Sequence, residues 1–534
     1  MLGLMMHRPL LVSSLIEHAD RHHGHTPIVS RNADGTVYRG SWRSTHNRCR
    51  KLANVLQALG VATGDRVGTL GWNHHRHLEA YYAISGMGAI CHTINPRLFP
   101  EQIAGIILHA EDKILLVDPM FLPLLESLAS QLTCVAQVIV MNEPGAHLPP
   151  SVLPLLGYEA LLQEASSDYE WPEMDERTAA ALCYTSGTTG KPKGVLYSHR
   201  STLLHAWAVS LPDSLSFSAC DSVLPVVPLF HANAWGFPYA AALVGAKMVL
   251  PGPLLDGPNL YQLLESEKVT LTAGVPTVWN NLMQYLQAEG CQLHYLKRLG
   301  VGGAACPRTI VSYFEDVQKV SVLPGWGMTE TSPVAALTLP KANQVGLVGQ
   351  ARRDWLARSG RPLFGVDMEV VDDEGWPLPH DGHTFGHLMV QGHWVCNGYY
   401  KDPSEPLQQG WFPTGDVAVI DEEGFMQITD RAKDMIKSGG EWISSIELEQ
   451  VAVGHPAIQE AAVIGIHHPH WGERPLLLAV KKPGQVLTAE DLRGYLEQRI
   501  AKWWIPEQIE FVDGLPHTAT GKLNKAALRA QRGL

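Results

Sequence analysis

A short segment dense in glycine, hydroxyl and lysine residues has the chemistry of a phosphate-binding loop. It runs from Tyr184 to Gly194 as Tyr-Thr-Ser-Gly-Thr-Thr-Gly-Lys-Pro-Lys-Gly. Glycines let backbone N–H groups approach a polyphosphate, hydroxyls donate to its oxygens, and lysines add positive charge. The P-loop of nucleoside triphosphatases is excluded, because Gly187 and Gly190 are too close together and Lys191 precedes proline. We therefore predict a different triphosphate loop, between a buried strand over 179–184 and a second strand over 195–197.

Further segments that could do chemistry follow in a fixed order along the chain. They are Pro-Leu-Phe-His at 228–231, Gly-Gly-Ala at 302–304, Gly-Trp-Gly-Met-Thr-Glu at 325–330, Thr-Gly-Asp at 414–416, Asp-Arg-Ala-Lys-Asp at 430–434 running on to Ser-Gly-Gly at 438–440, and Pro-His-Thr-Ala-Thr-Gly-Lys at 516–522. In this order the series resembles the adenylate-forming superfamily of acyl-CoA synthetases, luciferases and peptide-synthetase adenylation domains. The resemblance covers nearly the whole chain. It implies that a carboxylic acid attacks the α-phosphorus of ATP to give acyl-AMP and pyrophosphate.

The elements that must position these residues follow an α/β rhythm. Between residues 44 and 117, amphipathic helices alternate with short apolar strands at 66–70, 89–94 and 114–117, which predicts a doubly wound parallel sheet. Similar alternation recurs over 221–323. After about residue 430 the pattern changes to a compact α+β unit, with helices predicted over 446–453 and 489–502 and strands over 461–466, 476–480 and 509–512.

These patterns and the resemblance together give a domain plan. We expect a large N-terminal domain of doubly wound sheets with a β-rich sub-domain over 1–430, a hinge at 431–433, and a small mobile C-terminal domain over 434–534. The resemblance implies that this small domain rotates on the hinge between the two half-reactions.

Composition narrows the class of protein. A chain of 534 residues with 45% hydrophobic content is long enough for two or more domains. The net charge of −12 argues against a nucleic-acid surface, and no stretch reads as a membrane span or secretion signal. The eight cysteines lack paired spacing, which indicates reduced thiols. We expect a cytoplasmic protein without integral membrane association.

Histidine is abundant, and three short clusters could suggest a metal site. They lie at 22–25, 74–77 and 467–470. Their flanks look loop-like and no carboxylate or cysteine spacing completes a closed site, so solvated or partly packed imidazoles are the better interpretation.

The resemblance implies roles in adenylation for individual residues. Lys522 would lie between the acyl carboxylate and the phosphate, with His231 and Glu330 as the other catalytic residues and Glu330 also holding Mg²⁺. Asp416 would accept hydrogen bonds from the ribose hydroxyls, with Arg431 at the ribose or phosphate. The remaining residues expected to bind ATP or AMP are Thr185, Ser186, Gly187, Thr188, Thr189, Gly190, Lys193, Gly302, Gly303, Ala304, Trp326, Gly327, Met328 and Thr329.

The resemblance also implies an acyl pocket and a coenzyme A tunnel. His231, Trp235, Gly302 and Trp326 would wall the pocket, and the large indole of Trp235 should shorten it. Around Trp235, at 440–445 and at 360–367, the sequence is similar to medium-chain acyl-CoA synthetases that include 3-methylmercaptopropionate CoA ligases. This similarity favours a short- or medium-chain acid. The residues expected to form the hinge and the tunnel are Lys433, Lys437, Ser438, Gly439, Gly440, Glu441 and Trp442.

Three positions depart from the family pattern. His387 stands where relatives usually have Glu, His517 where Lys is frequent, and Lys525 where Arg is common. None touches the core pair Gly521 and Lys522. The expected function is an ATP-dependent acyl-CoA synthetase, as a homodimer. The alternatives are a ligase that loads a carrier protein, a luciferase-type oxygenase, and a non-catalytic adenylate-binding relative.

Overall fold

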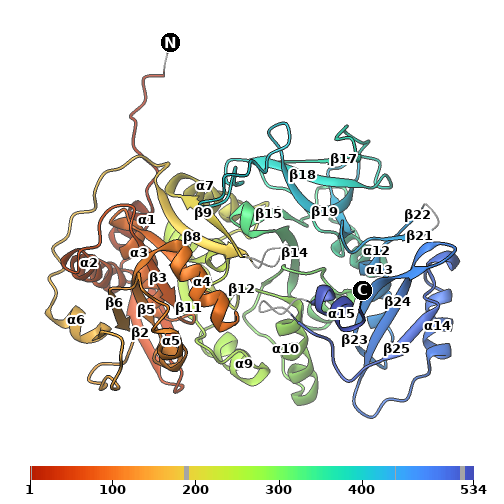
Figure 1. The fold of residues 1–534 in the computed structure, drawn as a ribbon, viewed down its shortest axis with the longest axis horizontal. Helices are drawn as coiled ribbons and strands as arrows, with labels where there is room; N and C mark the ends of the chain where they lie inside the picture. Colours follow the sequence, from red (N-terminus) through yellow and green to blue (C-terminus); the bar gives the residue numbers. More distant parts are fainter. Residues whose placement is uncertain (2, 186–191, 439–440, 518–522, 534) are drawn as a thin grey trace.

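The computed structural model describes all residues except 2, 186–191, 439–440, 518–522 and 534. In this part of the chain the strands form four sheets, and the C-terminal sheet lies at one end of the molecule (Figure 1). Three sheets belong to a large N-terminal domain and the fourth to a smaller one. The predicted α/β fold with a smaller α+β C-terminal domain is confirmed.

The first large sheet carries the predicted phosphate loop at one edge. As far as the structure describes it, the sheet has seven strands in the order β7 (Leu155–Gly157), β6 (Gln137–Val140), β5 (Asp112–Val117), β3 (Arg66–Leu70), β4 (Ile90–Thr93), β8 (Ala179–Thr185) and β9 (Lys193–Ser198). Its neighbours are parallel except for β8 and β9, which form an antiparallel pair. The predicted strand at 66–70 is confirmed, and so is the alternation with helices that follows it.

The second large sheet is parallel in its centre and antiparallel at both edges. Its strands, over the described residues, are β16 (Arg361–Pro362), β15 (Val334–Leu337), β14 (Ser321–Gly327), β13 (Arg298–Val301), β12 (Leu271–Gly274), β10 (Ser222–Pro225), β11 (Lys247–Leu250), β1 (Pro27–Arg31) and β2 (Val37–Ser41). The Gly-Gly-Ala and Gly-Trp-Gly segments therefore lie at the carboxyl ends of the neighbouring strands β13 and β14.

The two smaller sheets account for the rest of the strands. The β-rich sub-domain is an antiparallel sheet of β17 (Val366–Val371), β18 (Gly386–Gly392), β19 (Phe412–Ile420) and β20 (Met426–Arg431). The C-terminal sheet consists of β22 (Glu441–Ile443), β21 (Ile436–Ser438), β24 (Gly472–Lys481), β23 (Ile458–His468) and β25 (Gln508–Phe511).

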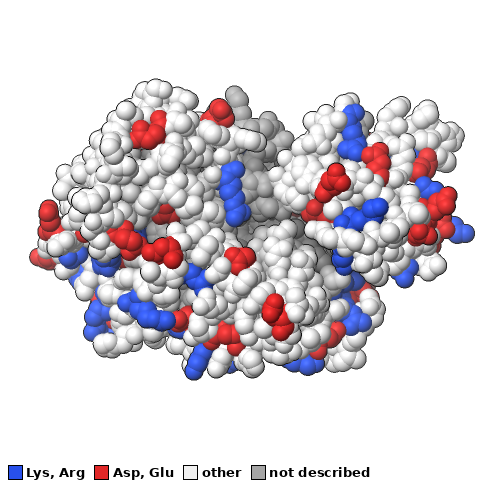
Figure 2. Space-filling view, turned by 90° about the horizontal axis from the view of Figure 1, so that it is seen from below, with Lys and Arg blue, Asp and Glu red and all other residues white. Residues whose placement is uncertain are grey.

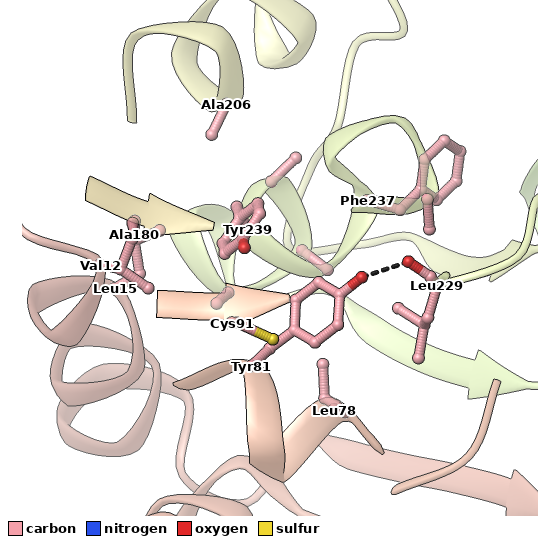
Figure 3. Close-up of a cluster of buried hydrophobic side chains, with 14 of the residues drawn as sticks. Val12, Leu15, Leu78, Tyr81, Cys91, Ala180, Ala206, Leu229, Phe237 and Tyr239 are labelled. Carbon is pink, nitrogen blue, oxygen red and sulfur yellow. Dashed lines mark hydrogen bonds between the residues drawn. The ribbon is translucent and has the colours of Figure 1, made fainter. Parts of the chain in front are cut away.

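The main core lies between the two large sheets. It joins apolar side chains of α1, α2, α3, α7 and α8 to strands of both sheets. Figure 3 shows its centre, where Tyr81 of α3 donates a hydrogen bond to the carbonyl oxygen of Leu229. The helices of the N-terminal domain are α1 (Val12–His23), α2 (Trp42–Ala58), α3 (His75–Gly86), α4 (Pro100–Ala110), α5 (Leu122–Leu128), α6 (Tyr158–Glu164), α7 (His199–Ser210), α8 (Phe237–Val244), α9 (Gly257–Ser266), α10 (Pro276–Glu289), α11 (Arg308–Val311) and α12 (Gly349–Leu356).

The C-terminal helices are α13 (Ser445–Val453), α14 (Ala489–Glu497) and α15 (Lys525–Gln531). Ser444 caps α13 by accepting a hydrogen bond from the backbone N–H of Glu447. The helix predicted over 489–502 is too long. It ends at Glu497 because Ala501 is extended before a 3₁₀ turn that packs Trp504 against the domain core.

The structure corrects the prediction that the histidines at 74–77 have loop-like flanks, because they begin helix α3. His74 caps the N-terminus of α3 by accepting from the N–H of His77, and its Nε2 lies 2.6 Å from Asp118 Oδ1. His75 is buried and stacks on Tyr38. Within the described ranges, no three His, Cys, Asp or Glu side chains cluster as metal ligands.

The distribution of surface charge and the length of the helices bear on whether the protein binds polyanions or crosses a membrane. On the face shown in Figure 2, acidic and basic side chains are interspersed. None of the helices in the described ranges combines the length and apolar character needed to cross a bilayer.

Candidate active site

One large cavity brings together most of the residues singled out from the sequence. Its volume is about 940 Å³, and it lies where the β8–β9 hairpin, the ends of β13 and β14, and the C-terminal domain meet. From the C-terminal domain, His517, Leu523 and Asn524 contribute to its wall. The predicted site residues that line it are Thr185, Lys193, His231, Trp235, Gly302, Gly303, Trp326, Gly327, Met328, Thr329, Glu330, Arg431 and Lys433.

Other predicted residues lie elsewhere. Ala304, Lys437 and Ser438 are not part of the cavity wall. Asp416 is not part of it either, but its carboxylate contacts Trp326 and Arg431, which both line the cavity. Glu441 and Trp442 form part of β22. Ser186, Gly187, Thr188, Thr189, Gly190, Gly439, Gly440 and Lys522 lie outside the described residues.

The base of the predicted phosphate loop is a β-hairpin. Thr185 at the end of β8 pairs with Lys193 at the start of β9. The Nζ atom of Lys193 lies 4.5 Å from the ring centroid of Tyr399 and 4.0 Å from Asp402 Oδ2. The hairpin thus holds a threonine and a lysine at the cavity, which suits an anionic ligand.

A fixed carboxylate lies behind the Gly-Trp-Gly segment. Asp416 is buried on β19, and its Oδ2 accepts a hydrogen bond of 2.9 Å from the indole N–H of Trp326. Its Oδ1 lies 2.8 Å from Arg431 Nε at the end of β20. The structure therefore joins a residue of β14 to a pair of residues on the neighbouring strands β19 and β20. It also shows that Trp326 is oriented by a hydrogen bond, which the sequence does not reveal.

Glu330 is held in a short 3₁₀ turn directly after β14. The residue is 6% exposed, and its Oε1 accepts a hydrogen bond of 2.9 Å from the hydroxyl of Tyr399. Tyr197 supports the turn by donating to the carbonyl oxygen of Thr329 at 2.6 Å. Burial and the Glu330 carboxylate raise the pKa of Tyr399, so its hydroxyl stays protonated. Sequence reasoning missed both tyrosines, and the only local signal was the aromatic pair Tyr399-Tyr400 beside Gly398.

The segment that carries His231 and Trp235 has an uncommon backbone. Ala232, Asn233, Ala234 and Trp235 all have φ between 42° and 55°, in the left-handed region that non-glycine residues avoid. Trp235 lies close to Gly302, where an added Cβ would come within 2.9 Å of the indole Cη2. Glycine at 302 is therefore required by the close approach of this indole.

Buried polar groups support this left-handed turn. The side-chain oxygen of Asn233 accepts hydrogen bonds from the hydroxyl of Tyr81 on α3 and from the thiol of Cys183 on β8. Asn233 donates to the hydroxyl of Tyr239. Tyr81 and Cys183 come from distant parts of the chain, so their contacts support a conformation that the local sequence disfavours.

A polar network of the C-terminal domain lies beside the predicted hinge. Lys525 is buried on α15 and lies 2.7 Å from Glu449 of α13, and Arg529 lies 2.7 Å from Asp434. The N–H of Ser445 donates to Asp430. Lys525, a departure from the family pattern, is thus part of a buried ion pair.

The other two departures lie on the surface. His517 forms a contact of 2.6 Å with Glu460, and His387 one of 2.8 Å with Asp373. His517 also contributes to the cavity wall, whereas His387 lies on β18, away from it.

Comparisons with known proteins agree with this fold and site. The model of the AMP-binding enzyme family matches residues 15–400, and the model of the AMP-binding enzyme C-terminal domain matches residues 447–522. The chain therefore belongs to the AMP-binding enzyme family, which confirms the resemblance drawn from its motifs.

Three of the similar proteins are named as CoA ligases. The chain is 50% identical to a 3-methylmercaptopropionyl-CoA ligase of Ruegeria lacuscaerulensis, over 99% of this chain and 98% of the relative. It is 49% identical to a medium-chain-fatty-acid–CoA ligase of Ectopseudomonas oleovorans, over 100% and 98%. Its fold matches an anthranilate CoA ligase in complex with anthranoyl-AMP, with a TM-score of 0.86, 26% identity and 97% coverage of both chains.

Proposed function

We propose that this chain is an AMP-forming acyl-CoA ligase. It would convert a short- or medium-chain carboxylic acid, with 3-methylmercaptopropionate as a candidate, to its CoA thioester at the expense of ATP. The observation that carries this proposal is identity near 50% along the whole chain to two such ligases.

The first half-reaction would join the acid to AMP. An oxygen of the carboxylate attacks the α-phosphorus of ATP, the bond to the β-phosphate oxygen breaks, and pyrophosphate leaves. The protein's task is to position the reactants and to neutralise charge. Thr185 and Lys193 would contact the phosphates, together with the loop residues 186–190. Asp416 would accept hydrogen bonds from the ribose hydroxyls, and Lys522 would lie between the carboxylate and the phosphate.

Glu330 fits the magnesium ion that this chemistry implies. Mg²⁺ prefers oxygen ligands and is commonly held by one or two carboxylates together with substrate phosphates. Glu330 offers a buried carboxylate on the cavity wall, which suits that mode of binding. When bound, Mg²⁺ would neutralise the negative charge of the phosphate oxygens.

The second half-reaction would transfer the acyl group to coenzyme A. The thiol sulfur attacks the acyl carbonyl carbon, AMP leaves, and the thiol loses its proton. We propose that residues 1–430 and 434–534 form the two domains, with the hinge at 431–433. Rotation at this hinge would move Lys522 away from the active site and bring the segment 437–442 to the same place.

The acyl group would occupy the part of the cavity beside Trp235. Apolar residues that line the cavity, including Leu215, Ala273, Leu323 and Leu337, favour an aliphatic tail. The indole of Trp235 against Gly302 would then limit the tail's length.

The proposed activity is tested by following CoA consumption with a panel of acids. We expect thioester formation from short- and medium-chain acids, with AMP and pyrophosphate as the other products. Thioester formation on a holo carrier protein but not on CoA would replace this proposal with a carrier-loading ligase. Light emission from the enzyme mixed with acid, ATP and oxygen would indicate a luciferase-type oxygenase. ATP binding without turnover would indicate a non-catalytic relative.

Two further properties belong to the same proposal. We expect the enzyme to be a homodimer and to work in the cytoplasm, which fits its scattered cysteines and net charge of −12. Light scattering after size-exclusion chromatography would check the dimer, and fractionation of the source cells would check the location.

A further inference from the structure

Tyr399 lies between two opposite charges in the cavity. Its hydroxyl donates to Glu330 Oε1 at 2.9 Å, while the Nζ atom of Lys193 lies 4.5 Å from its ring centroid. The side chain is half-buried, lines the cavity, and packs edge-on against Phe412. One aromatic ring thus contacts both a carboxylate through its donor and an ammonium group through its face.

The backbone around Tyr399 is tied to the same two places. The N–H of Cys396 donates to the carbonyl oxygen of Glu330 at 2.8 Å. The N–H of Tyr400 donates to the carbonyl oxygen of Gly194, the residue after Lys193, also at 2.8 Å. The segment 396–400 therefore bridges the turn after β14 and the start of β9, and Tyr399 lies at the centre of this bridge.

We propose that Tyr399 is a positioning residue that orients Glu330 and Lys193 for a metal–nucleotide complex. This inference rests on the proposed function, because it assigns Glu330 to Mg²⁺ and Lys193 to phosphate. The hydroxyl of Tyr399 fixes the position of the Glu330 carboxylate, and its ring face lies against the ammonium group of Lys193, which Asp402 approaches within 4.0 Å from another direction. One rigid side chain therefore sets the positions of both groups relative to each other.

Tyr399→Phe isolates the hydroxyl from the ring. The variant keeps the aromatic face toward Lys193 but loses the donor to Glu330. We expect the Kd for Mg·ATP, measured by calorimetry without acid or CoA, to rise about tenfold, or roughly 1.4 kcal/mol. The Kd for ATP in EDTA should change less than twofold. Tyr399→Leu removes the aromatic face as well, so both dissociation constants should rise.

Matched controls separate positioning from folding. Tyr400→Phe alters the adjacent tyrosine, which is not part of the cavity wall, and should bind both forms of ATP as the wild type does. Melting temperatures are recorded for every variant. Glu330→Gln combined with Tyr399→Phe should bind Mg·ATP no more weakly than Glu330→Gln alone, since the two side chains would act as one unit.

The outcomes distinguish this inference from the proposed function. Wild-type affinity for Mg·ATP in Tyr399→Phe, or an equal loss for metal-free ATP, would overturn the inference while the ligase proposal stands. Additive losses in the double variant would also overturn it. A wild-type protein that binds neither form of ATP would overturn both.

Discussion

At the scale of single residues, the contact between Trp235 and Gly302 makes acyl-chain selection testable. Trp235→Ala should open space beside Gly302 that longer tails fill, at about 0.8 kcal/mol for each buried methylene. The profile of kcat/KM over a series of straight-chain acids should move toward longer acids, and short acids should lose affinity.

A second substitution at the same contact serves as the control. Gly302→Ala should impair the wild type, because its Cβ would come within 2.9 Å of the indole, but it should be tolerated when Trp235 is also Ala. If Trp235→Ala lowers the melting temperature without moving the chain-length profile, the indole is ordinary core and does not select the substrate.

At the scale of elements, the ion pair between α15 and α13 should stabilise the C-terminal domain. Burial disfavours the charged ammonium, but Glu449 and Asp430 hold the pKa of Lys525 above its ordinary value. Lys525→Met would leave Glu449 buried without its partner, which typically costs about 3–5 kcal/mol. Urea unfolding of the C-terminal domain measures this loss. Lys525→Met combined with Glu449→Gln should lose less than Lys525→Met alone, and an equal or larger loss would contradict the role of the pair.

The connection between the domains offers a test of rotation. Lys433 is exposed, and its backbone N–H donates no hydrogen bond to any of the described residues. Proline at this position therefore removes no backbone hydrogen bond within the described part of the chain. Proline fixes φ near −65° and restricts the preceding residue, so Lys433→Pro should keep adenylation but slow thioester formation from acyl-AMP. Pyrophosphate exchange and CoA consumption measure the two steps separately, with Lys433→Ala as control. Normal rates for both steps in the proline variant would place the rotation elsewhere.

At the scale of the whole molecule, buried histidines should make the N-terminal domain sensitive to acid. Burial lowers the pKa of His77 and His199 to about 4 and that of His205 to about 3, from 6.5 in an exposed side chain. Below pH 6.5 the unfolded chain binds protons that the folded chain does not, so the free energy of unfolding falls as pH falls. Each histidine contributes about 1.4 kcal/mol per pH unit in that window.

His205→Gln checks this sign. The variant loses one titrating group, although glutamine still offers an acceptor for the N–H of Val334. Between pH 6.5 and 4.5, its free energy of unfolding should fall less steeply than that of the wild type, by about 1.4 kcal/mol per pH unit. Equal slopes in urea unfolding series would show that His205 is not held neutral in the folded protein.

Local patterns in the sequence predict much of the fold, and order along the chain predicts much of the cavity. The strand at 66–70 and the helix after Pro100 follow from apolar periodicity and from proline at a first helical turn. Tyr399 could not be predicted, because its contact with Glu330 spans 69 residues and depends on how two sheets pack. The left-handed turn at 232–235 could not be predicted either, since Tyr81 and Cys183 from other elements support it against local preference.

The acyl-adenylate route is tested most directly by following oxygen from the acid. The wild-type enzyme is given a medium-chain acid labelled with ¹⁸O in both carboxylate oxygens, together with ATP, Mg²⁺ and CoA. If the acid attacks the α-phosphorus, one labelled oxygen must remain on AMP when the thiol displaces it. We therefore predict AMP that carries one ¹⁸O, in equal amount to the thioester and pyrophosphate. Labelled inorganic phosphate with ADP, or unlabelled AMP, would contradict an acyl-adenylate intermediate.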